Sequence, residues 1–125
     1  MFPIAGRISI YLCTRPTDMR KAYNGLSGEV TNYMGHEPTS GDLFVFVNRP
    51  RNRMKILYWE RHGFWLFCKR LEAGRFQMPV FNTSESASHI EYEQLVMILE
   101  GIDLHSVRRR KRFHLKKDKK TKENT

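Results

Sequence analysis

The 125-residue sequence lacks several features that would place it in a familiar class. No apolar run approaches the roughly 18 residues that a membrane-spanning helix needs. Residues 1–13 are too short and too strand-like for a secretory signal, so we expect a cytoplasmic protein without membrane contact. Cysteine occurs only as Cys13 and Cys68, each in an apolar run. This pattern predicts two reduced, buried thiols, and the absence of metal-ligand spacing predicts no metal site and no cofactor.

Catalytic signatures are equally scarce. A Gly-rich phosphate loop is absent, because Gly25 and Gly28 fall inside a helical pattern with no lysine in the required place. The acidic residues have simpler interpretations: Asp18 as a helix cap, Glu60 and Glu72 at turns. A Cys–His nucleophile built from Cys68 and His62 would require an accident of folding. We therefore predict no catalytic residues, no enzyme activity and no small-molecule substrate, with a small nuclease or RNA-binding regulator as a disfavoured alternative.

Positive charge is abundant and unevenly spread. The formal net charge is +9, and residues 106–125 alone hold ten basic and two acidic side chains. Residues 49–75 hold eight basic and two acidic side chains, while the rest of the chain is acidic on balance. Too few apolar residues interrupt the C-terminal run to support a core. We predict a single folded domain over residues 1–105 and a basic, disordered tail over residues 106–125.

Hydrophobic periodicity predicts an α+β fold. Apolar spacing indicates one helix that begins after a Thr17 or Asp18 cap and ends at Gly35, and a second helix over residues 90–103. β-branched and aromatic runs indicate a mostly antiparallel meander of four or five strands. The expected strands are residues 7–13, 43–47, 53–60, 64–71 and 76–81.

The central strands are apolar on both faces, which two helices cannot easily cover. We therefore expect either a barrel-like closure or one face left open for a partner. A two-residue turn at His62 and Gly63 would place Tyr58 opposite Phe67. For Tyr58 and Trp65, we favour a place in the core or a protein interface over base stacking, which remains the alternative.

Three stretches carry a family resemblance: "TDMRKAYNGL", "GDLFVFVNRPRNRMKILYWERHGFWLFCKRLEAGRF" and "EQLVMILEGID". With them, residues 7–103 resemble the accessory protein called TnpB, or Orf2-like, of the sixty-six family of bacterial insertion sequences. The resemblance implies a small protein encoded beside a separate transposase and needed for movement of the element. The sequence departs from the family at residues 48–52, where Asn-Arg-Pro-Arg-Asn replaces a small Gly-containing turn.

Charge placement suggests how such a protein would act. The Pro50-stiffened loop presents cations that suit a phosphate backbone, and a second group is expected near the opposite end of the neighbouring strands. We predict DNA, specifically the element ends, and the transposase as partners, with a homodimer as a further option. A pure protein adaptor with incidental charge is the rival hypothesis. The predicted nucleic-acid contacts are Arg49, Arg51, Arg53, Lys55, Lys69, Arg70, Arg75, Arg108, Arg109, Arg110, Lys111 and Arg112.

Overall fold

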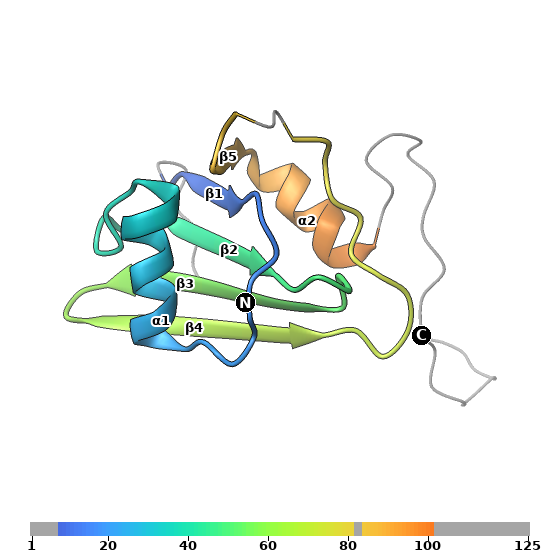
Figure 1. The fold of residues 1–125 in the computed structure, drawn as a ribbon, viewed down its shortest axis with the longest axis horizontal. Helices are drawn as coiled ribbons and strands as arrows, with labels where there is room; N and C mark the ends of the chain where they lie inside the picture. Colours follow the sequence, from blue (N-terminus) through green and yellow to red (C-terminus); the bar gives the residue numbers. More distant parts are fainter. Residues whose placement is uncertain (1–7, 82–83, 102–125) are drawn as a thin grey trace.

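A computed structural model describes residues 8–81 and 84–101 of the chain. They form a five-stranded sheet with a helical segment on each side, which confirms the predicted α+β class. Figure 1 shows the arrangement. The strands are β1 (Ile10–Cys13), β2 (Leu43–Val47), β3 (Arg53–Glu60), β4 (Gly63–Arg70) and β5 (Ala87–Ile90); the helices are α1 (Tyr23–Glu29), continued by a π-helical turn over Val30–Met34, and α2 (Tyr92–Glu100).

The strand order is β4-β3-β2-β1-β5, so the meander holds for only three of the five strands. β1 pairs with β2 in parallel, and β5 adds to β1 in antiparallel orientation. The predicted strand over residues 76–81 is wrong. That segment crosses the end of the sheet, where the Phe76 amide donates to the Arg51 carbonyl at 2.7 Å. The last strand instead lies at Ala87–Ile90, in a polar stretch whose sequence gives little strand signal.

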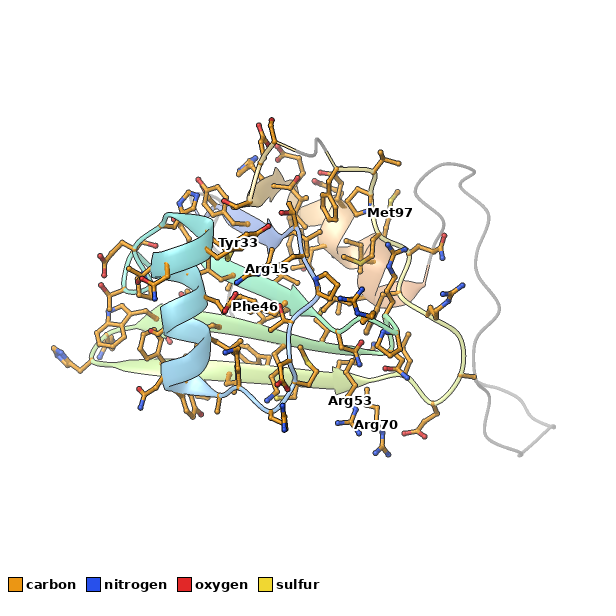
Figure 2. The ribbon with its side chains drawn as sticks, in the orientation of Figure 1. Arg15, Tyr33, Phe46, Arg53, Arg70 and Met97 are labelled. Atoms are coloured by element: carbon orange, nitrogen blue, oxygen red, sulfur yellow. The ribbon has the colours of Figure 1, made fainter. Side chains whose placement is uncertain are left out.

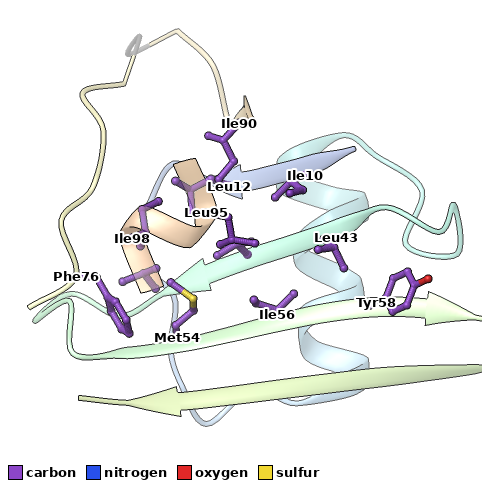
Figure 3. Packing of buried hydrophobic residues seen from close by; sticks show 12 residues of the cluster. Ile10, Leu12, Leu43, Met54, Ile56, Tyr58, Phe76, Ile90, Leu95 and Ile98 are labelled. Carbon is purple, nitrogen blue, oxygen red and sulfur yellow. The ribbon is translucent and has the colours of Figure 1, made fainter. Parts of the chain in front are cut away.

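Both faces of the central strands β1, β2 and β3 are covered, each by one helical segment, whereas β4 stays partly exposed; the expectation of a barrel-like closure or a wholly uncovered face is therefore wrong. On one face, Leu95 and Ile98 of α2 pack among twelve buried residues that include Leu43, Ile56 and Phe76 (Figure 3). On the other, α1 and its π turn bury Leu26, Val30 and Met34 against Phe44, Phe46 and Leu57. Two short helices can thus cover the apolar side chains on both faces of a sheet when they lie on opposite sides of it.

The first helix begins later than the Asp18 cap predicts. Asp18 accepts a hydrogen bond from the Arg20 amide at 2.9 Å and pairs with the Arg20 guanidinium at 2.7 Å, which closes a turn ahead of α1. The helical segment ends at Gly35, whose φ of 74° is the left-handed conformation expected of a C-terminal glycine. α2 begins after a capping box between Glu91 and Gln94.

The β3–β4 hairpin has a register two residues away from the expected one. Glu60 pairs with Gly63, so Arg61 and His62 form the turn, and Arg61 adopts a left-handed φ of 53°. A shift of two residues preserves which side chains share a face, because the side-chain period of a strand is two. Tyr58 therefore lies opposite Trp65 rather than Phe67.

Tyr58 and Trp65 have different environments although they are cross-strand neighbours. Tyr58 is 7% exposed and belongs to the core on the α2 side. Trp65 is 53% exposed on the edge strand β4 and stacks on Phe67 with ring centroids 5.9 Å apart. The core interpretation is therefore confirmed for Tyr58, while Trp65 is a surface side chain.

Candidate nucleic-acid interface

One end of the sheet brings together six of the basic residues of the folded part. β2 ends there, β3 begins there and β4 ends there, so Arg53 and Arg70 are direct cross-strand partners. Figure 2 shows both pointing away from the sheet at this end. The hydrogen bond between the Phe76 amide and the Arg51 carbonyl brings the Arg75 backbone to the same place. The basic end, as we call it, comprises Arg49, Arg51, Arg53, Lys69, Arg70 and Arg75.

The expectation of two separate cationic groups at opposite strand ends is therefore wrong. In an antiparallel hairpin the first residue of one strand faces the last residue of the next, and here Met54 pairs with Lys69 as Arg53 pairs with Arg70. The chain then runs from Leu71 back past the β2–β3 loop, where the Leu71 amide donates to the Asn52 carbonyl at 2.8 Å. Two charged segments well separated in sequence are neighbours in space.

The loop between β2 and β3 is held in one conformation by its own hydrogen bonds. The Asn48 side-chain oxygen accepts from the amides of Asn52 and Arg53, at 3.0 and 3.1 Å, and its amide group donates to Asn52 at 2.8 Å. The Arg51 amide donates to the Asn48 carbonyl at 3.0 Å, and Arg51 has a φ of 61°. Arginine rarely adopts this left-handed conformation, so the surrounding bonds must impose it. The loop presents Arg49 and Arg51, both exposed, on an ordered backbone.

The cations of this region differ in their partners. The Lys55 ammonium donates to the carbonyls of Met19 and Lys21, at 2.8 and 2.7 Å, and so ties the segment before α1 to the sheet. Lys69 donates to the Leu99 carbonyl at 3.2 Å, and Arg70 pairs with Glu72 at 2.9 Å. No ion pair within the described ranges involves the remaining arginines of the basic end, which are Arg49, Arg51, Arg53 and Arg75.

The direct opposition of Arg53 and Arg70 is unfavourable by itself. Like charges facing each other across a strand pair destabilise a sheet. The exposed Arg70–Glu72 pair offsets little of this repulsion, because surface ion pairs contribute at most about 1 kcal/mol. An anion bound between the two guanidinium groups would offset it more fully. The arrangement therefore favours a negatively charged ligand at this position.

Sequence reasoning missed Arg15, which lies beside this end. Because β1 and β2 are parallel, the residues after both strands meet at one edge, and Arg15, Arg49 and Arg51 line a small pocket of about 170 Å³. Arg15 stacks on the Tyr33 ring at 3.8 Å and pairs with Glu29 at 3.0 Å, a bond that raises its pKa. The signal was a cation two residues after an apolar strand, but its neighbours follow only from the parallel pairing.

The two cysteines have unlike environments, and the prediction that both are buried is wrong for one of them. Both thiols are free. Cys13 is buried, and this burial raises its pKa, whereas Cys68 is exposed on β4 opposite Lys55. Asp18 has its pKa lowered to about 2 by hydrogen bonds from Arg20. In the described part of the chain, no three His, Cys, Asp or Glu side chains are grouped so that they could hold a metal ion.

The remaining predicted contacts, Arg108, Arg109, Arg110, Lys111 and Arg112, lie outside the described residues, as do the rest of the tail and Ile102. Across residues 8–81 and 84–101, no helix is long and apolar enough to cross a membrane.

Fold and site together define a small α+β protein with five exposed arginines, Arg49, Arg51, Arg53, Arg70 and Arg75, at one end of a five-stranded sheet. The chain belongs to the family described as IS66 Orf2 like protein, whose model matches residues 8–109. The match confirms the resemblance and extends it past residue 103 to the first two arginines of the tail. Membership supports an accessory role in transposition of an insertion sequence, alongside the transposase.

Two similar proteins come from Sinorhizobium fredii. The uncharacterized protein y4jC is 32% identical over 103 residues, which cover 82% of this chain and 86% of the relative. The uncharacterized protein y4hO is 34% identical over 103 residues, covering 82% of this chain and 88% of the relative. Their names state no activity, and no solved structure matches this chain.

Proposed function

We propose that this protein is a non-catalytic accessory factor of transposition that binds DNA through the basic end of its sheet and through its C-terminal tail. The observation that carries the proposal is the meeting of the β2–β3 loop, the Arg53–Arg70 pair and the Arg75 segment at one end of the fold. Four of these arginines have no carboxylate partner among the described residues, so their guanidinium groups are available to phosphates.

The ordered loop favours contact with the phosphate backbone of DNA over recognition of the base sequence. Arginines on a fixed backbone lose side-chain freedom but little backbone freedom when they bind, which favours affinity over that of a flexible loop. Contacts from arginine to phosphate position a protein on DNA without reading its sequence. Lys55 was predicted as a further contact; its ammonium forms two hydrogen bonds to carbonyls, and we assign it the role of holding the segment before α1 in place.

The experiment measures DNA binding by fluorescence anisotropy for the full chain and for a full-length variant in which all ten basic residues of positions 106–125 are changed to Gln. Element-end DNA and random DNA are compared at several salt concentrations. The proposal expects the tail variant to retain salt-dependent binding through the basic end. Loss of all binding in this variant, for both DNAs, would leave the folded part without a DNA role.

A protein-adaptor function has one observation in its favour. Trp65 is 53% exposed, stacks on Phe67 and lies on the edge strand β4, and exposed aromatic residues are enriched in protein interfaces. Its partner would be the transposase or a second copy of this chain. Co-purification of the transposase with the unmodified protein and with a Trp65→Ser variant tests this function; capture that is unaffected by the substitution would contradict a role for this face.

A further inference from the structure

A pocket opens at the basic end on the α1 side of the β3–β4 hairpin, with a cavity volume of about 490 Å³. The pairings explain how it is built. Arg53 faces Arg70 and Lys55 faces Cys68, and directly opposed residues of an antiparallel pair share a face of the sheet. The hydrogen bonds from the Lys55 ammonium to the Met19 and Lys21 carbonyls identify that face as the one beneath the segment before α1.

The pocket has two chemically distinct tiers. The outer tier is cationic, formed by Arg53 and Arg70 at the end of the sheet. The inner tier lies one step further along the strands and consists of Cys68, the Lys55 side chain and Met19. Two of the three N–H groups of the Lys55 ammonium already donate to carbonyl groups, so the inner tier presents mainly polarizable sulfur and aliphatic carbon beside a charge that is already hydrogen-bonded.

This combination fits more than a phosphate group. Ligand pockets have volumes of about 300–1,000 Å³, and a lone phosphate would fill only the outer tier. A phosphate joined to an aromatic base would use both tiers, with the phosphate at the two guanidinium groups and the base against the thiol, the thioether and the methylene groups. A base within a duplex can enter a pocket only if it is first unpaired and unstacked, which costs free energy that an unpaired base does not need.

We infer that this pocket binds one unpaired nucleotide of DNA, with its phosphate between Arg53 and Arg70 and its base against Cys68 and Met19. The inference rests on the proposed DNA binding and narrows it to single-stranded or locally unpaired DNA. Glu72 also lines the pocket and pairs with Arg70 at 2.9 Å, so the entering phosphate displaces this carboxylate from the guanidinium group.

The Cys68 thiol can itself report whether the pocket is occupied. Cys68 is exposed in the pocket wall, whereas Cys13 is 3% exposed with its pKa raised by burial, so a thiol-alkylating reagent reports on Cys68 in the unmodified protein. Mass spectrometry of the two cysteine peptides follows the alkylation rate with saturating DNA. The probes are a 12-nucleotide single strand, a blunt duplex of the same sequence, and an abasic strand of the same length and charge. Anisotropy measures the binding of each probe in parallel.

The single strand is expected to slow Cys68 alkylation about 10-fold at a concentration ten times its Kd, as simple occupancy requires. The blunt duplex and the abasic strand, at equal occupancy, should slow alkylation less than about 2-fold, because neither supplies an accessible base to the inner tier.

Equal protection of Cys68 from alkylation by all three DNAs would overturn the inference, because it would mean that the sugar–phosphate backbone alone covers the pocket. Binding of the single strand without protection of Cys68 would overturn it as well, while leaving the proposed DNA binding intact. If anisotropy detects no binding of any probe, the proposed function fails together with the inference. A Cys68→Ser variant confirms that the measured alkylation occurs at this thiol.

Discussion

The two ends of the β3–β4 hairpin differ in charge and in the segments that connect the strands there. At the basic end, Arg53 faces Arg70, and the adjoining loop is held by hydrogen bonds of the Asn48 side chain. At the other end, Glu60 accepts a hydrogen bond from the Trp65 indole at 3.1 Å, and a two-residue turn exposes Arg61 and His62. One end joins several loops and concentrates like charge, while the other closes with one tight turn.

This difference shows that topology, rather than composition alone, creates the candidate interface. The parallel pairing of β1 with β2 and the return of the chain past Phe76 bring segments around residues 15, 49–53, 70 and 75 to one edge. Arg61 carries the same charge as these arginines but lies at the end of the hairpin away from them. It is therefore the natural control for every test of the basic end.

The largest expected effect comes from removing the opposed arginines. We expect the Arg53→Gln/Arg70→Gln double variant to bind DNA about 10- to 100-fold more weakly at low salt, because two charge-assisted phosphate contacts are lost. The matched control is Arg61→Asn, since asparagine tolerates the left-handed conformation of this position. Anisotropy titrations measure both variants, and an equal loss in the control would contradict the assignment to the basic end.

The next effect is on stability. A Lys55→Met substitution removes both hydrogen bonds to the Met19 and Lys21 carbonyls, and we expect the free energy of unfolding to fall by about 2 kcal/mol. Lys69→Met is the control, because the exposed Lys69 ammonium makes a single bond to Leu99. Urea denaturation monitored by circular dichroism compares them; equal midpoints for Lys55→Met and the unmodified protein would show that the tether contributes nothing.

A smaller effect of opposite sign is expected at Glu72. Its carboxylate pairs with Arg70 at 2.9 Å and competes with phosphate for that guanidinium group. The Glu72→Gln substitution should therefore tighten DNA binding by about 2- to 5-fold, an amount in keeping with the small energy of an exposed ion pair. Anisotropy at fixed salt provides the measurement, and unchanged or weaker binding would show that Arg70 does not contact DNA.

The smallest effect concerns pH. Arg20 holds the Asp18 pKa at about 2, below its ordinary 3.8, so the ionised carboxylate is favoured in the folded protein. This contribution to stability is fully present above the ordinary pKa and is lost as the pH falls through the folded value. We expect a carbon-detected NMR titration to give a pKa of about 2 for Asp18 and a higher pKa in the Arg20→Gln variant, still below 3.8 because the backbone amide of residue 20 keeps donating to the carboxylate. An unshifted value in the unmodified protein would contradict the pairing.

Much of the fold can be predicted from the sequence because its signals are local. β2 and β3 match their predicted bounds, β4 differs by one residue at each end, and Gly35 ends the helical segment as its position after the apolar stripe indicates. The signals fail where tertiary contacts decide. Ala87–Ile90 becomes a strand by pairing with β1. The Asp18 carboxylate accepts a hydrogen bond from the Arg20 amide in a turn rather than capping α1.

Only part of the candidate site could be predicted from the sequence, because tertiary contacts decide which cations meet. The cations of the loop could be recognised by type, but their union with Arg70 and Arg75 depends on hairpin register and on the path of the chain after Leu71. Arg15 could be found only once β1 was known to lie parallel to β2. The two tiers of the pocket depend on which face of the sheet lies beneath the segment before α1. The alternation of side chains along a strand shows which residues share a face, but not which segment covers that face.

The most direct test of the central claim is the salt dependence of DNA binding by the tail-neutralised full-length variant, with and without Arg53→Gln/Arg70→Gln. Each phosphate contact contributes about 0.9 to the slope of log K against log salt on duplex DNA, and about 0.7 on a single strand. The account predicts that the double substitution makes the slope shallower by roughly 1.4 to 1.8, while Arg61→Asn leaves it unchanged. A slope that is the same in all three proteins would contradict a DNA-binding role for the basic end.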